Sequence, residues 1–237
     1  ADPALSPDGN RLAYVLSWVD RIRGGDVETR SRLNMVELDG EGTPQEFTQG
    51  NKDTAPRFSP DGNLLGFLRA TESDEAQVWV MGVAGGEARQ ITRSPKGVAD
   101  FAWSPRSNRL VFCADVDPDI GSDTLEPGPQ VSVVTRVRYR YDTLGWRGDS
   151  HFHLFVADVD GEDARQVTDG DWDDTRAVWS PDGSRIAFIS SRRDDRDQRA
   201  LSEVYVLSAD GGEPDMWSRG LYSIGALSWS PDSRRLV

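Results

Sequence analysis

Three arginines alternate with other residues in one short stretch of the chain: Arg136, Arg138 and Arg140. In a β-strand their side chains share one face, because successive side chains of a strand point to opposite faces. A guanidinium group can bind a carboxylate through two parallel hydrogen bonds. We therefore predict that Arg136 and Arg138 bind a substrate carboxylate or orient a peptide. Salt bridges to nearby Asp and Glu, or to another domain, are the alternative and the more common use of such arginines.

Two acidic runs resemble metal-binding loops, and neither has the required geometry. The first run matches positions 1, 3, 5, 9 and 12 of a calcium-binding EF-hand loop: Asp115, Asp117, Asp119, Asp123 and Glu126. The glycine that this loop needs at position 6 is replaced by Ile120. The second run, Asp169, Asp171 and Asp173, has no glutamate at position 12. We predict that both runs are solvated acidic loops.

Two histidines and one cysteine complete the residues that could do chemistry. His151 and His153 would share one strand face, as a zinc pair does, but no third ligand is marked nearby. We predict that they are ordinary strand residues, and that the chain binds no metal and no cofactor. Cys113 is the single cysteine, so no disulfide can form within the chain, and we predict a small core residue.

Composition excludes two classes of partner. The 237 residues include 27 Lys and Arg against 40 Asp and Glu, a formal net charge of −13. A nucleic-acid-binding protein needs positive charge to replace counterions on phosphate, so we expect no nucleic acid partner. No run of 18 or more apolar residues exists, so we expect no membrane-spanning helix.

An internal repeat predicts the elements that position these residues. Ser-Pro-Asp-Gly, complete or degraded, recurs at intervals of about 50 residues, with one longer interval. Proline presets φ for a type I turn, and glycine supplies the positive φ that closes a hairpin. The motif is complete at 6–9, 59–62 and 180–183, and degraded at 104–107 and 230–233.

Each copy is flanked by alternating apolar residues, which indicate half-buried strands. A second glycine turn follows at Gly40, Gly85, Gly161 and Gly211. Every repeat therefore has four antiparallel strands, which is one propeller blade. We predict an all-β fold, a β-propeller of four-stranded antiparallel blades. A two-sheet sandwich is the alternative, but it gives no reason for in-register repetition.

The repeat also predicts the organisation of the chain. We expect a partial N-terminal propeller domain over 1–237, with complete blades at about 3–50, 53–95, 99–170 and 174–220. The third blade carries an insertion over 115–150, and a fifth blade, 225–237, is incomplete. Because a blade that ends there leaves inner strands unpaired, we expect the chain to be part of a larger protein.

The repeated units resemble two groups of proteins. Both the TolB-type propellers and the propellers of the prolyl-oligopeptidase family of serine peptidases have such Trp-Ser-Pro-Asp-Gly and Asp-Gly-Gly-Glu units. The segment 134–146, which reads Val-Thr-Arg-Val-Arg-Tyr-Arg-Tyr-Asp-Thr-Leu-Gly-Trp, is similar to the acylaminoacyl-peptidase branch of the second group. That resemblance implies a propeller of seven blades that caps a C-terminal α/β-hydrolase domain.

The resemblance also implies where the chemistry lies. The hydrolase domain of this family carries Ser, Asp and His, with the serine in a Gly-x-Ser-x-Gly turn. This sequence contains no such turn, so we expect no catalytic residue within it.

We therefore expect the propeller domain of an acylaminoacyl-peptidase-like or dipeptidyl-peptidase-like serine peptidase. It would cover the active site and restrict access to short peptides. The expected partners are the C-terminal hydrolase domain and a short peptide, the expected location is the cytoplasm, and self-association is left open. The alternative is a non-catalytic, periplasmic, TolB-like propeller that mediates protein–protein interaction.

Overall fold

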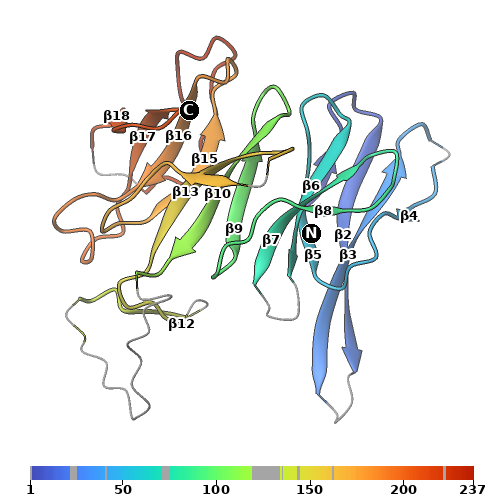
Figure 1. The fold of residues 1–237 in the computed structure, drawn as a ribbon, viewed down its shortest axis with the longest axis horizontal. Helices are drawn as coiled ribbons and strands as arrows, with labels where there is room; N and C mark the ends of the chain where they lie inside the picture. The colour runs from blue at the N-terminus through green and yellow to red at the C-terminus, as the bar shows by residue number, and fades with distance from the viewer. Residues whose placement is uncertain are drawn as a thin grey trace.

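The structure is a computed structural model that describes residues 2–21, 26–40, 42–70, 75–118, 134, 136–142, 145–161, 163–220 and 223–237. Every regular element in these ranges is a β-strand, and sixteen of the strands form four antiparallel sheets of four. Figure 1 shows the sheets side by side in chain order, from the first in blue to the fourth in orange and red. The predicted all-β propeller architecture is confirmed.

The strands of each sheet pair in chain order. The first sheet contains β1 (Ala4–Leu5), β2 (Arg11–Arg21), β3 (Val27–Glu37) and β4 (Gln45–Glu46). The second contains β5 (Asp53–Phe58), β6 (Leu64–Ala70), β7 (Ala76–Gly82) and β8 (Arg89–Gln90). The third contains β9 (Val98–Trp103), β10 (Arg109–Val116), β13 (His151–Asp158) and β14 (Ala164–Gln166). The fourth contains β15 (Asp174–Trp179), β16 (Arg185–Ser190), β17 (Glu203–Ser208) and β18 (Asp215–Met216).

The Ser-Pro-Asp-Gly motif closes the turn between the first two strands of each sheet. In the second sheet, the backbone N–H of Gly62 donates to the Ser59 carbonyl at 2.9 Å, and Gly62 has a φ of +74°. The Ser59 hydroxyl donates to Asp61 Oδ1 at 2.6 Å and accepts the Leu64 N–H at 2.9 Å. Serine and aspartate are therefore as much a part of the turn as proline and glycine, a role that the spacing alone did not indicate.

The degraded copies of the motif replace glycine by serine without changing the backbone. Ser107 and Ser233 have φ values of +60° and +58°, which is unfavourable for a side chain with a Cβ atom. Each hydroxyl accepts a hydrogen bond of 3.1 Å from the turn of the preceding repeat, at the N–H of Asp61 or of Asp182. These hydrogen bonds between neighbouring turns offset part of the backbone cost.

The hydrophobic core lies between the sheets. Each of three apolar clusters joins adjacent sheets, for example Leu33 with Phe67, Val78 with Phe112, and Val111 with Phe188.

A tryptophan precedes three of the five Ser-Pro pairs and lies between two repeats. Its indole N–H donates to a backbone carbonyl of the preceding sheet, from Trp103 to Arg57 at 2.9 Å and from Trp179 to Ala102 at 3.3 Å. The incomplete fifth repeat begins in the same way, because Trp229 donates to the Val178 carbonyl at 3.3 Å.

Candidate functional site

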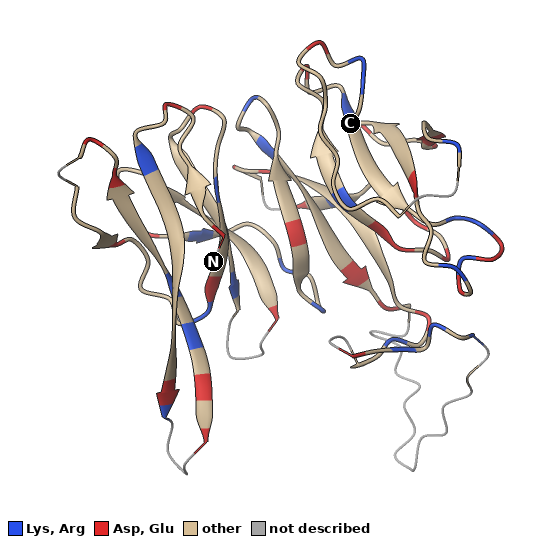
Figure 2. Ribbon diagram, turned by 180° about the vertical axis from the view of Figure 1, so that it is seen from behind, with Lys and Arg blue, Asp and Glu red and all other residues tan. Residues whose placement is uncertain are grey.

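The candidate site lies at the end of the sheets opposite the Ser-Pro turns. The insertion leaves the third sheet after β10 and returns at β13, and its described part includes the hairpin of β11 (Arg140–Tyr141) and β12 (Gly145–Trp146). Figure 1 shows this hairpin beyond the ends of the sheets. Figure 2 shows that charged residues of both signs are frequent there and in the neighbouring segment 191–202.

The structure corrects the expectation of one continuous strand through the three arginines. Residues 136–139 bend, and only Arg140 and Tyr141 pair with a neighbouring strand. As a result Arg136 and Arg138 are half-buried and turned toward the protein, whereas Arg140 is exposed. The alternation predicted one shared face for all three side chains, and the structure brings only two of them into the site.

Arg136 joins the insertion to the segment 191–202. Its Nε and Nη2 atoms donate to the two carboxylate oxygens of Asp197 at 2.8 and 2.9 Å, and Nη1 donates to Asp171. The hydrogen bonds that Arg136 donates to Asp197 raise the pKa of Arg136, so this guanidinium stays charged. All three guanidinium nitrogen atoms of Arg136 therefore donate hydrogen bonds to carboxylates of the protein itself.

Arg138 is held more loosely. Its Nη2 atom donates to Asp173 Oδ2 at 3.1 Å, and its guanidinium lies 5.2 Å from the ring centre of Tyr141. The side chain is 35% exposed. It lines a cavity of about 520 Å³ between the insertion and the segment 191–202.

Arg147 is the central residue of this charged cluster, and the sequence analysis missed it. The residue is 5% exposed, and its guanidinium stacks on the Phe152 ring at 4.2 Å. Its Nη2 atom donates to Asp115 Oδ1 at 3.1 Å, to Asp173 Oδ1 at 3.2 Å and to the Ser150 carbonyl at 2.9 Å. Arg147 thus ties the third sheet to the fourth.

The two histidines face carboxylates of the fourth repeat from strand β13. His151 Nε2 lies 3.0 Å from Asp171 Oδ1, and His153 Nδ1 lies 3.5 Å from Asp174 Oδ2. Asp174 is completely buried and also accepts a hydrogen bond of 3.0 Å from Arg192. Both histidines therefore take part in the contact between the third and fourth sheets.

The predicted acidic runs are used as ion-pair partners. Asp115 pairs with Arg147, Asp117 pairs with Lys96 at 2.6 Å, and Asp171 and Asp173 pair with arginines of the insertion. Asp119, Asp123 and Glu126 lie outside the described residues. Within the described ranges no group of three or more His, Cys, Asp or Glu side chains is arranged to hold a metal ion.

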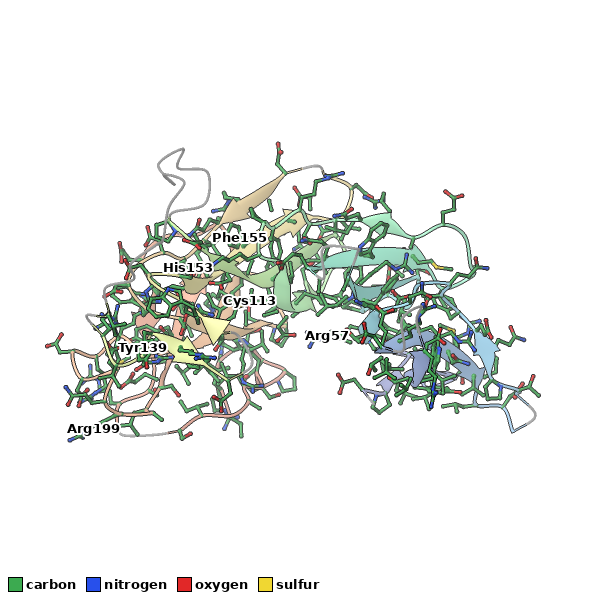
Figure 3. The ribbon with its side chains drawn as sticks, turned by 90° about the horizontal axis from the view of Figure 1, so that it is seen from below. Arg57, Cys113, Tyr139, His153, Phe155 and Arg199 are labelled. Atoms are coloured by element: carbon green, nitrogen blue, oxygen red, sulfur yellow. The ribbon has the colours of Figure 1, made fainter. Side chains whose placement is uncertain are left out.

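Cys113 is a core residue, as predicted. It is 3% exposed, and burial, together with nearby carboxylates such as Asp100, raises the pKa of its thiol. A protonated, buried thiol is a poor nucleophile. Figure 3, which views the molecule from the end that carries the insertion, places Cys113 and His153 inward of Tyr139.

No helix in the described part of the chain is long and apolar enough to cross a membrane.

The ionisation of Asp173 should make stability depend on pH. Burial by itself raises the pKa of Asp173, but His151, the Phe152 N–H, Arg147 and Arg138 outweigh burial and lower the pKa to about 2. A lowered carboxyl pKa contributes stability above the unfolded-state value of 3.8 and loses it as the pH falls toward 2. The shift corresponds to about 2 kcal/mol.

Urea unfolding followed by tryptophan fluorescence can check this dependence. We expect Asp173→Asn to lower the free energy of unfolding more at about pH 6 than at about pH 2. An equal loss at the two pH values would contradict the pKa assignment.

Comparison with known proteins identifies relatives over almost the whole chain. No family model matches the sequence. An uncharacterized peptidase, YuxL, of Bacillus subtilis is 31% identical over 87% of the chain, and dipeptidyl-peptidase 5 of Porphyromonas endodontalis is 25% identical over 99%. The chain spans about a third of the length of these relatives, 32% and 36% respectively.

Solved structures share the fold. The acylaminoacyl peptidase of Pyrococcus horikoshii superposes with a TM-score of 0.69 at 20% identity, over 92% of this chain and 32% of its own. A TolB candidate from Agrobacterium tumefaciens gives a TM-score of 0.61 at 20% identity, over 98% of this chain and 70% of its own. Together with the sequence relatives, these structures confirm the predicted resemblance to propellers of prolyl-oligopeptidase-type peptidases.

Proposed function

We propose that residues 1–237 are the propeller part of a serine peptidase that acts on short peptides, similar to acylaminoacyl peptidases or dipeptidyl peptidases. The observation that carries the proposal is the sequence match to two proteins named as peptidases, over 87% and 99% of the chain. The catalytic Ser, Asp and His are proposed to lie outside these residues, in a C-terminal α/β-hydrolase domain. A cytoplasmic location is part of the same proposal.

The propeller's proposed role is to cover the active site and exclude large substrates. The sheets pack against one another through buried cores that include the tryptophan contacts described above, so a covering built from them is rigid. A rigid cover admits an oligopeptide through a narrow opening but does not admit a folded protein. It also keeps water from the reacting groups while a peptide is bound.

The experiment uses the full-length protein that contains residues 1–237. A fluorophosphonate probe should label one serine outside these residues, and peptides of increasing length should then be compared with a folded protein as substrates. We expect kcat/KM to fall by about tenfold or more once the substrate is too large to enter. If the probe labels a serine but folded protein is cleaved as fast as short peptides, the proposed exclusion of large substrates is contradicted. If the probe labels no serine and no peptide is hydrolysed, the peptidase proposal is contradicted.

A non-catalytic, TolB-like propeller in the periplasm is the second candidate. It is favoured by the Agrobacterium tumefaciens structure, of which this chain covers 70%, against 32% of the acylaminoacyl peptidase chain. Failure of the full-length protein to react with the fluorophosphonate probe, together with recovery of a stable complex with another protein, would support it.

A further inference from the structure

We propose that the cavity between the insertion and the segment 191–202 binds the terminal carboxylate of a short peptide, and that Arg138 is the group that receives it. The inference rests on the proposed function, because it names the end of the substrate that the propeller holds. The cavity has a volume of about 520 Å³, enough for the last residues of a peptide. Its walls include Arg138, Tyr141, Thr175, Ser191, Gln198 and Arg199.

The charge balance of the walls favours an anion. Three arginines line the cavity, Arg138, Arg196 and Arg199, against two carboxylates, Asp173 and Asp197, and each carboxylate also pairs with an arginine that does not line it. Asp197 accepts two of the three hydrogen bonds of Arg136, and Asp173 lies 3.2 Å from Arg147. Arg199 pairs with Asp195 at 3.2 Å and Arg196 pairs with Asp171, so Arg138, which shares Asp173 with Arg147, is the wall arginine with the least charge compensation.

Arg138 donates fewer hydrogen bonds within the described part of the chain than its neighbours Arg136 and Arg196 do. Arg136 donates hydrogen bonds from its guanidinium to Asp197 and Asp171. Arg196 donates hydrogen bonds to Asp171 and to two backbone carbonyls. Among the described residues, Arg138 donates to a single acceptor, Asp173. Its other N–H groups can form the two parallel hydrogen bonds that a carboxylate accepts.

Two neighbours help to position Arg138. Arg147 holds Oδ1 of Asp173, which leaves Oδ2 to fix Nη2 of Arg138. The ring of Tyr141 lies against the guanidinium and limits its rotation. We assign Arg147 as a positioning residue, because it reaches the cavity only through Asp173.

The cavity also offers a polar group for the peptide backbone next to the carboxylate. The Ser191 hydroxyl is buried and has no hydrogen-bond partner among the described residues. A buried hydroxyl without a partner costs free energy, and a peptide N–H or carbonyl can supply the missing hydrogen bond. A main-chain carboxylate occurs only at the C-terminal end of a chain, so a site that binds this group together with the neighbouring backbone distinguishes the end of a peptide from an internal segment.

The test compares two probes on the full-length protein: acetyl-tetraalanine with a free carboxylate, and the same peptide as its C-terminal amide. Binding is measured by isothermal titration calorimetry after fluorophosphonate treatment, so it does not depend on hydrolysis. The wild-type protein should bind the free acid about tenfold or more tightly than the amide. Arg138→Met should remove this preference, and Arg138→Lys should retain part of it.

Arg140→Met is the matched control, because Arg140 is exposed and lies in the same segment but does not line the cavity. It should retain the preference for the free acid. Equal binding of the two probes to the wild-type protein, or no binding of either, would overturn the inference, as would an unchanged preference in Arg138→Met. A protein that binds the acid selectively but hydrolyses nothing would overturn the proposed function and leave this site standing.

Discussion

Replacing Arg147 by methionine is expected to lower the free energy of unfolding by about 3–5 kcal/mol, because removing one partner of a buried ion pair leaves an uncompensated charge. The guanidinium of Arg147 is 4% exposed and hydrogen bonds to Asp115 and Asp173. Methionine can keep much of the contact with Phe152 but cannot replace these hydrogen bonds. The measurement is the urea midpoint of the full-length protein, followed by tryptophan fluorescence.

The control is Arg11→Met, which breaks an exposed ion pair with Glu37. Exposed pairs contribute about 1 kcal/mol or less, so this change should have a small effect. The loss in Arg147→Met should also shrink at about pH 3, where protonation of Asp115 and Asp173 removes the uncompensated charges. A loss as small as that of the control, or one that does not depend on pH, would show that Arg147 does not hold the two carboxylates.

The repeat unit could be predicted from the sequence because its signals are local. Proline and glycine act within a few residues of their position, and the motif that contains them recurs in register. The turns predicted at 59–62 and 180–183 therefore have the expected positive φ at Gly62 and Gly183, +74° in each.

The insertion could not be predicted in the same way, because its structure depends on distant partners. The alternating arginines predicted a strand, but a strand needs a neighbour, and only Arg140 and Tyr141 have one. Arg147 contacts Asp115 and Asp173, which are 32 and 26 residues away in sequence. No periodicity links such positions, so the residue at the centre of the charged cluster carried no local signal.

Replacing Trp179 by alanine is expected to lower the free energy of unfolding by about 3–5 kcal/mol, the usual range for a buried Phe or Trp changed to Ala. Trp179 is 7% exposed, packs in the core between the third and fourth sheets, and lies under the guanidinium of Arg109 at 5.1 Å. Trp179→Phe keeps most of the apolar contact and loses the hydrogen bond to Ala102, so its cost should be nearer 1 kcal/mol. Trp146→Ala, at a residue that is 48% exposed, is the control and should have little effect.

Hydrogen exchange on the same variants shows which sheets depend on this contact. The core around Trp179 contains Val111 of β10 and Phe188 of β16, so the cavity left by alanine removes packing from two sheets at once. Amides of β10 and β16 should therefore exchange faster together, whereas amides of β2, two sheets away, should change less. Faster exchange confined to the fourth sheet would mean that each sheet is stable by itself. Coupled exchange would mean that the contacts between repeats hold the propeller together, as a rigid cover over an active site requires.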